Sequence, residues 1–289
     1  MLRSCFHTMT HAKKILFITQ EIDPYQSGTE LSTIGRNIPQ QALDCGREIR
    51  NFMPKWGDIN ERRCQLHEVI RLSGMNLIID DTDHLLIIKV ASIPSSRMQV
   101  YFIDNDDYFQ KRNEWADDSG KEYEDNGERA IFYARGVLET VKKLRWVPDI
   151  IHCQGWMSAI VPLYLKLAYN EEPSFRDSKV VFTPCGPKLE KPMSEQFRAN
   201  LLFKGVTRET LETLPQTMYL NDLYRMALQY SDGLMLTPEY PMPELVAEAE
   251  AAGKPVFIST EAENTESETP YIDYFDQLWS IGKGTKETD

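Results

Sequence analysis

The chain has 289 residues, of which 42% are hydrophobic, so it can bury the core of one large α/β domain or two small ones. Its formal net charge of −12 excludes nucleic acid and anionic membranes as expected partners, because a surface this acidic repels both. The five cysteines are scattered and form no CxxC pair, which argues against disulfides or a zinc site and favours a reducing cytoplasm. We therefore expect a cytoplasmic protein with no metal and no cofactor.

The first elements in the chain predict a strand, a loop and a helix. Residues 1–12 lack a signal peptide and are expected to be a disordered or non-native extension, since Met9 can serve as the start. The apolar run at 15–18 predicts a strand buried on both faces of a parallel sheet. Ser27 stands three residues before an acidic side chain, a spacing that predicts a capping box and a helix start. That helix should kink or break at Pro39 and end at Gly46.

The middle of the chain predicts a β-rich insertion followed by an acidic loop. The expected strands are 48–53, 67–72, 75–79, 85–90 and 99–103. The segment 104–128 carries ten acidic residues, which favour either a cation site or a solvated loop. Its spacing does not match an EF-hand, so the solvated loop is the preferred interpretation.

The second half alternates predicted strands and helices. The expected helices are 128–143, 157–169, 220–230, 244–252 and 271–280, with short helices in 194–216. The expected strands are 150–153, 179–183, 233–237 and 256–258. This order predicts an α/β fold, with a single Rossmann-like, doubly wound parallel sheet that contains a β-rich insertion. We assign 13–260 to that domain and 261–289 to a linker and a terminal helix.

In such sheets ligands bind beyond the carboxyl ends of the strands. Three loops follow those ends here, at 21–28, 152–156 and 184–186, and we expect them to converge on one crevice. A loop with Gly28 that leads into a helix start is suited to bind a phosphate or a sugar. Without a GxGxxG or GK[ST] motif, a plain turn without a ligand is the preferred interpretation from these residues alone.

Several stretches in these regions resemble the bacterial glycogen and starch synthases (glycosyltransferase family 5), in the amino-terminal starch synthase catalytic domain. The matching stretches are 14–24 (first strand and S-E-x-x-P), 52–59 (L-L-P-x-Y-x-x-I), 100–104 (V-Y-F-I-D), 125–129 (D-N-x-x-R), 146–156 (W-x-P-D-(I/V)-(I/V)-H-x-H-D-W) and 230–238 (A-D-x-(I/L)-x-x-V-S-P). Their shared order makes the resemblance specific, although each motif is weak alone.

The resemblance implies the amino-terminal half of a GT-B glycosyltransferase, which transfers glucose from ADP-glucose or UDP-glucose to an α-1,4-glucan. Such an enzyme places a second Rossmann-like domain across a cleft, and that domain holds most of the sugar-nucleotide pocket. The resemblance carries a substrate-binding role to six positions: Glu21, Ser27, Gly28, His152, Gln154 and Trp156.

Three further positions depart from the family's pattern. Gln26 stands where we align the family's phosphate-facing Lys, Gly155 replaces the Asp of H-x-H-D-W, and Cys185 replaces the His of V-H-N. Phosphate binding needs placed cations, and the transfer step needs positioned polar groups. These departures predict that the chain is inactive alone, and no residue is assigned as catalytic. His152 is best interpreted as a structural histidine, Trp156 as a packing residue and Cys185 as an inert thiol.

Three functions stay open at this point. The first is a glucosyltransferase domain that works with a second half supplied in trans; a basic side chain such as Lys188 or Lys191 in the crevice would favour it. The second is a non-catalytic module that binds a glucan or a partner, which a closed crevice would favour. The third, an unrelated nucleotide-binding regulator, lacks a phosphate-loop motif. An α-glucan, a sugar nucleotide, a protein partner or a second copy across an apolar cleft face are the expected ligands and partners.

Overall fold

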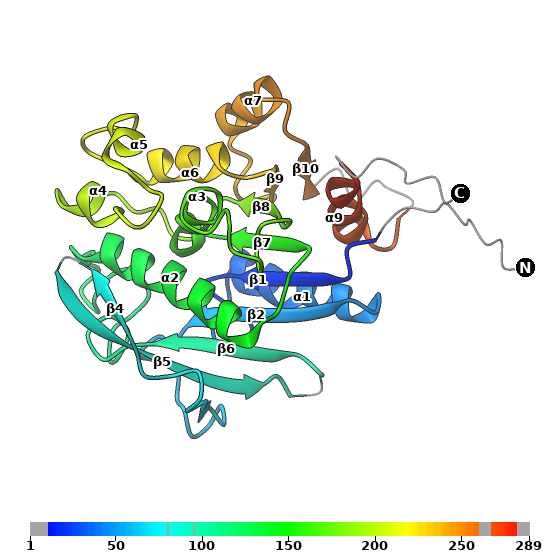
Figure 1. Cartoon of the computed structure of the whole chain (residues 1–289). Coiled ribbons are helices and arrows are strands. Elements are labelled where there is room, and N and C mark those ends of the chain that lie inside the picture. Colours follow the sequence, from blue (N-terminus) through cyan, green and yellow to red (C-terminus); the bar gives the residue numbers. More distant parts are fainter. Residues whose placement is uncertain (1–10, 80, 95, 260–266, 282–289) are drawn as a thin grey trace, which may run out of the picture.

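A mostly parallel sheet forms the centre of the computed structural model, which describes residues 11–79, 81–94, 96–259 and 267–281 (Figure 1). Its strands lie in the order β10-β9-β8-β7-β1-β2-β6-β5-β3, and β4 pairs with β5. The strands are β1 (Lys14–Ile18), β2 (Glu48–Pro54), β3 (His67–Glu68), β4 (Met75–Ile79), β5 (Thr82–Ser92), β6 (Gln99–Asp104), β7 (Ile150–Gln154), β8 (Lys179–Thr183), β9 (Gly233–Leu236) and β10 (Val256–Ile258).

Pairing in the sheet confirms the predicted α/β class. Strands β10, β9, β8, β7, β1, β2 and β6 run parallel, whereas β5 pairs antiparallel with β3, β4 and β6. The chain adds β2 and then β6 on one side of β1 and returns through a helix to β7 on the other side. The strand order therefore reverses between β1 and β7, where open α/β sheets bind their ligands.

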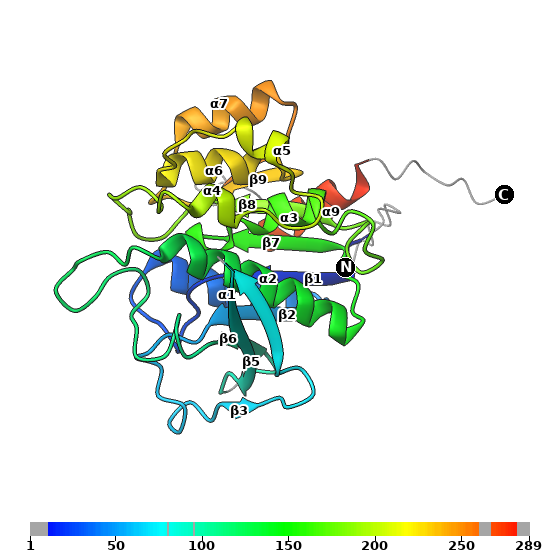
Figure 2. The ribbon, with the colours of Figure 1, turned by 60° about the vertical axis from the view of Figure 1, so that its left-hand side comes forward.

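Helices cover both faces of the sheet (Figures 1 and 2). The helices are α1 (Glu30–Asp44), α2 (Asn126–Leu144), η1 (Trp156–Ser158), α3 (Val161–Leu167), α4 (Phe197–Asn200), α5 (Arg208–Glu212), α6 (Leu220–Gln229), α7 (Pro243–Ala251) and α9 (Pro270–Ser280). On one face α2, η1, α3 and α6 contact one another, and on the other face α1 contacts α9. Buried apolar side chains of the sheet and of both helical layers form one core cluster.

The first helix begins later than the sequence predicts. Its N-cap is Thr29, whose hydroxyl accepts from the Ser32 amide at 2.9 Å while the Ser32 hydroxyl accepts from the Thr29 amide. The Ser27 hydroxyl instead donates to Asp23 at 2.6 Å, in the loop before the helix. The helix also continues through Pro39, whose buried ring packs into the core. Gly46 follows its end with φ +75°, as predicted.

Two other predicted elements are shorter in the structure. The predicted strand at 67–72 pairs only over β3, because the amides of Leu72 and Ser73 turn back to the Val69 carbonyl. The predicted helix at 157–169 is divided into η1 and α3, and Pro162 stands in the first turn of α3.

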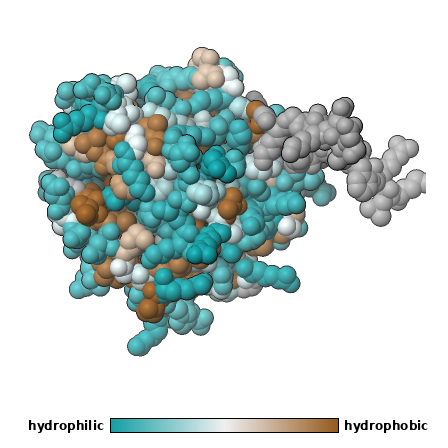
Figure 3. Space-filling view, in the orientation of Figure 1, coloured by the Kyte–Doolittle hydropathy of each residue, from teal (hydrophilic) through white to brown (hydrophobic). Residues whose placement is uncertain are grey.

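The two chain ends are described only in part. The expected extension at 1–12 lies outside the described residues apart from its last two, and so does most of the acidic linker that precedes α9. Helix α9 packs closely on the domain body, since Phe275 contacts the rings of Phe17 and His152. Apolar side chains on the surface in Figure 3 lie in scattered patches among hydrophilic ones.

Candidate functional site

The three loops at the strand ends meet around one side chain, that of Gln20. Gln20 is fully buried directly after β1. A Cβ atom on Gly155 would stand 2.3 Å from Gln20 Oε1, and one on Gly186 would stand 2.9 Å from Gln20 Nε2. Both glycines also have positive φ, +79° and +103°. Gln20 therefore fills the crevice between the loops that follow β1, β7 and β8, and both positions exclude a side chain.

Hydrogen bonds fix Gln20 in this place. Its carbonyl oxygen accepts from the Trp56 indole N–H at 2.7 Å, and its side-chain Oε1 accepts from the Met157 amide at 3.2 Å. Its side-chain Nε2 donates to the Glu114 carboxyl. The crevice is thus closed by the chain's own side chains.

A pair of carboxyl groups lies beside Gln20. Glu21 is 3% exposed and accepts from the Thr29 hydroxyl, and Glu114 lies near enough to affect its pKa. Burial raises the pKa of Glu21, and the same effect together with the Glu21 charge raises the pKa of Glu114 well above its usual value. Neighbouring carboxyl groups repel each other when both are ionised, which adds to the effect of burial on the pKa of Glu114.

Glu114 departs from the solvated loop that the sequence predicts for 104–128. The guanidinium of Arg129, a fully buried residue of α2, draws this segment inward, donating to the carbonyls of Glu114 at 2.8 Å and of Asn113 at 2.7 Å. No motif in the sequence marks Glu114. The nearest signal is the D-N-x-x-R stretch, whose arginine anchors the loop.

The polar side chains of β7 are buried beneath α9. His152 Nε2 lies 2.8 Å from the Thr183 hydroxyl and Nδ1 lies 3.2 Å from Gln154 Nε2, while its ring packs against Phe17 and Phe275. Burial lowers the pKa of His152 to about 3, so the ring is neutral at ordinary pH. His152 and Gln154 are both 0% exposed. A structural histidine, as the sequence favours, agrees with this geometry.

Trp156 and Cys185 are also withdrawn from solvent, each with 0% exposure. Trp156 packs within the hydrophobic core, and its indole N–H has no hydrogen-bond partner in the described chain. Cys185 donates to the Thr183 carbonyl at 3.5 Å. Burial and the nearby charges of Glu21 and Glu30 raise the pKa of the thiol well above its usual value, so it is a poor nucleophile.

The remaining predicted positions lie on the outer part of the first loop. Gln26 donates to both carboxylate oxygens of Asp58 at 2.8 and 2.9 Å, and Ser27 is hydrogen-bonded to Asp23. Gly28 has φ +94° and lets the chain turn into the Thr29 cap. No substrate contact is assigned to Gln26, Ser27 or Gly28, and the binding role of the predicted set stays a prediction.

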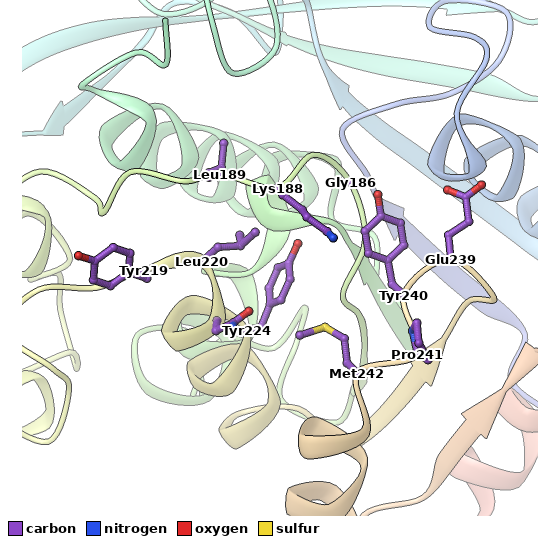
Figure 4. A pocket seen from close by; sticks show the side chains of 11 residues that line it. Gly186, Lys188, Leu189, Tyr219, Leu220, Tyr224, Glu239, Tyr240, Pro241 and Met242 are labelled. Carbon is purple, nitrogen blue, oxygen red and sulfur yellow. The ribbon is translucent and has the colours of Figure 1, made fainter. Parts of the chain in front are cut away.

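A cavity of about 560 Å³ lies beside the closed crevice, beyond the carboxyl ends of β8 and β9. We call it the tyrosine pocket. It is lined by Gly186, Lys188, Leu189, Tyr219, Leu220, Asn221, Tyr224, Glu239, Tyr240, Pro241 and Met242. Figure 4 shows the Lys188 amino group extending between the rings of Tyr224 and Tyr240. No motif in the sequence indicates its tyrosines, which lie just before α6, within α6 and after β9.

Two links join the tyrosine pocket to the crevice. Gly186 lines the pocket, and a Cβ there would meet Gln20, so the glycine lies between the two spaces. The Thr237 hydroxyl, after β9, donates to Glu30 in the first turn of α1 at 2.6 Å. Of the two lysines considered from the sequence, Lys188 lines this pocket, whereas the Lys191 amide donates to Glu122.

The described residues contain neither a metal-binding cluster nor a membrane-spanning helix. No cluster of three or more His, Cys, Asp or Glu side chains there is arranged to hold a metal ion. None of the described helices has the length and apolar character needed to cross a membrane.

Comparison with known proteins now identifies the family. The family model of the starch synthase catalytic domain matches residues 14–250. The chain belongs to the starch synthase catalytic domain family. This agrees with the resemblance that the motifs carry.

Two relatives of this starch synthase domain are glycogen synthases. The one from Pelodictyon phaeoclathratiforme is 33% identical over 235 residues, covering 75% of this chain and 48% of the relative. The one from Chlorobium chlorochromatii is 40% identical over 172 residues, covering 59% of this chain and 35% of the relative. The chain thus spans about half, or less, of the length of the relatives it matches.

A solved structure confirms the fold of this starch synthase domain. The catalytic domain of starch synthase IV from Arabidopsis thaliana, bound to ADP and acarbose, matches with a TM-score of 0.67 and 16% identity. The match covers 86% of this chain and 51% of that chain. The chain therefore has the fold of part of a GT-B starch synthase catalytic domain.

Proposed function

We propose that this glucosyltransferase-family domain binds an α-glucan in the tyrosine pocket and does not transfer glucose by itself. The observation that carries the proposal is the contrast between two neighbouring spaces. The strand-end crevice is filled by Gln20 and Glu114, whereas the tyrosine pocket is open and aromatic.

The tyrosine pocket has the chemistry that a sugar chain requires. Tyr219 is 49% exposed and presents a ring on which the apolar face of a glucose unit can pack. Asn221, Glu239 and Lys188 add donors and acceptors for sugar hydroxyls. Aromatic walls with a few polar groups are typical of sites that bind small molecules.

The charges around the crevice disfavour a sugar nucleotide. Glu21 and Glu30 lie at the start of α1, where a diphosphate would otherwise meet the helix dipole. Lys188 adds one positive charge in the neighbouring pocket, but Glu239 lies at the same pocket. A neutral glucan avoids repulsion by these carboxylates, while a diphosphate does not.

A second candidate is a glucosyltransferase half that becomes active with a second Rossmann-like domain. The Lys188 amino group favours it, because it extends into an open pocket where an anionic ligand could reach it. In that case ADP-glucose or UDP-glucose would bind mainly to the other domain, and this chain would hold the acceptor.

A transfer assay separates the two activities. The purified chain is incubated with radiolabelled ADP-glucose, and separately with UDP-glucose, in the presence of maltoheptaose. We expect no incorporation above a blank without protein, together with measurable maltoheptaose binding. Incorporation by the isolated chain would overturn the proposed lack of transfer, and absence of glucan binding would overturn the binding role.

A further inference from the structure

A second cavity, of about 500 Å³, lies where the loop after β6 and the start of α2 meet the β4–β5 hairpin. Four of the side chains that line it are acidic, namely Asp107, Glu124, Asp125 and Glu128. We call this cavity the acidic pocket. It shares no lining residue with the tyrosine pocket, so a ligand here is independent of the proposed glucan site.

The acidic pocket has an excess of negative charge. Of its four carboxylates, only that of Asp125 forms an ion pair with a Lys or Arg of the described chain, which is Arg112 at 2.5 Å. Asp107 and Glu124 are exposed, and Asp107 Oδ2 lies 3.2 Å from Nδ1 of the His84 ring. Among the described residues, this histidine is the one basic side chain that lines the pocket.

Glu128 is the residue that points to a ligand. It is only 9% exposed, and its Oε1 accepts from the Ser194 hydroxyl at 2.7 Å and from Asn200 Nδ2 at 3.1 Å. Its other oxygen, Oε2, is enclosed and has no hydrogen-bond partner in the described part of the chain. Because a buried carboxylate oxygen without a donor is costly, we expect a molecule in the pocket to supply that donor.

The dipole of α2 does not replace such a donor. Asp125 is the N-cap of this helix and Glu128 lies in its first turn, where the positive end of the dipole favours carboxylates. The dipole gives Glu128 Oε2 no hydrogen bond, however. Elsewhere in the chain the buried carboxylate of Asp276 has a cation of its own, Arg47 at 2.6 Å. Glu128 lacks the partner that a buried carboxylate ordinarily has.

The spacing of the acidic groups decides the kind of cation. No three His, Cys, Asp or Glu side chains of the described residues converge as a metal ion requires. An organic cation can reach separated carboxylates, because a carbon chain holds its charged nitrogens apart. A cavity of this volume also has room for a small molecule.

We propose that the acidic pocket binds a small organic cation with two or more ammonium groups. One ammonium group donates to Glu128 Oε2 at the buried end of the pocket. Another meets the exposed carboxylates of Asp107 and Glu124. This site gives a role to part of the acidic segment that follows β6.

Calorimetric titration of the purified chain with spermidine tests the proposal. At about 150 mM salt, attraction to the acidic surface as a whole is screened. We expect one saturable site for spermidine, whereas Mg²⁺ titrated alone should not bind at this pocket. A wild-type chain without saturable spermidine binding would overturn the proposal, and Mg²⁺ binding that is lost in Glu128→Gln would overturn the choice of an organic cation.

Three variants make the test specific. Glu128→Gln keeps an acceptor for Ser194 and Asn200 but loses the charge, so spermidine should bind about tenfold more weakly or worse. Glu124→Gln changes an exposed side chain of the pocket and should weaken binding about two- to fivefold. Glu171→Gln changes an exposed carboxyl outside the pocket and should bind like the wild type.

Two patterns among these variants would contradict the site. The first is equal binding by the wild type and Glu128→Gln. The second is equal weakening in all three variants, which would mean that spermidine responds only to the net charge of the chain. If Glu128→Gln fails to fold, the comparison of Glu124→Gln with Glu171→Gln still decides.

Discussion

At the residue scale, the side chain of Gln20 fills the space that a side chain at position 155 would need. The side chain of Gln20 extends to where a side chain at 155 would begin, at 2.3 Å from the ideal Cβ position. The family's Asp, which Gly155 replaces, could not fit there without moving Gln20. The closed crevice therefore follows from a matched pair of residues on two loops.

Gly155→Asp should lower the free energy of unfolding by about 2–4 kcal/mol, from overpacking against Gln20 and from the positive φ. In a Gln20→Ser background the overpacking part disappears, so the same substitution should be less damaging by roughly 1–3 kcal/mol. Denaturant unfolding of the four proteins of this double-mutant cycle measures the difference. Additive effects of the two substitutions would show that Gln20 and Gly155 do not compete for the space.

The lowered pKa of His152 predicts that the fold loses stability in acid. Its pKa is about 3 in the folded chain and about 6.5 in the unfolded chain, so the unfolded state binds the proton first as pH falls. The stability from the neutral ring is fully present above pH 6.5 and is lost progressively between pH 6.5 and 3. By linkage this amounts to about 2 kcal/mol between pH 7 and pH 5.

Comparison with a variant that cannot titrate at position 152 isolates the contribution of His152 to the loss of stability in acid. His152→Gln should be less stable at pH 7, because the bond to Thr183 is altered. The difference between wild type and variant should shrink by about 2 kcal/mol at pH 5. Parallel pH curves for the two proteins would mean that His152 does not control this part of the acid response.

At the element scale, α1 positions the carboxyl pair by approaching the loop after β1 very closely. A Cβ on Gly35 would stand 2.3 Å from the Glu21 carbonyl oxygen, which is backbone and cannot swing aside. The Thr29 hydroxyl at the start of the same helix holds the Glu21 carboxyl. The helix thus sets both the backbone and the side chain of Glu21.

Gly35→Ala should destabilise the fold by about 1–3 kcal/mol despite the better helix propensity of alanine, because α1 must move away from Glu21. Gly136→Ala in α2 is the matched control, since its Cβ would meet side-chain atoms of Leu86 at 3.0 Å and of Ile103 at 3.1 Å and no backbone atom of another element. Thermal unfolding of both variants measures the difference. A smaller loss for Gly35→Ala than for Gly136→Ala would contradict the close packing of α1 on the Glu21 backbone.

Elements were predictable from the sequence where apolar periodicity is strong, as in β4, β8 and β10, whose bounds agree with the structure. Caps were less predictable, because Ser27 and Thr29 both have suitable hydroxyls and only the fold shows that Thr29 accepts from the Ser32 amide. The position of Glu114 could not be predicted, since it depends on Arg129 drawing a loop across the strand ends. The burial of His152 could not be predicted either, because the sequence does not show which face of β7 lies under α9.

At the scale of the whole molecule, the sheet places two unlike spaces side by side at its carboxyl edge. One space is closed by Gln20, Glu21 and Glu114, and the other is the tyrosine pocket. The sequence predicted where the loops converge, because the carboxyl ends of parallel strands share an edge. It did not predict the tyrosine pocket, whose lining comes from segments far apart in the chain that meet only in the folded domain.

Calorimetric titration of the isolated chain with maltoheptaose tests the central claim most directly. We predict binding that weakens about five- to tenfold in Tyr219→Ala, corresponding to roughly 1–1.4 kcal/mol for one lost aromatic contact. Tyr230→Ala, at the other end of α6 and outside the pocket lining, should bind like the wild type. The account would be contradicted by no heat of binding in the wild type, or by equal weakening in the two tyrosine variants.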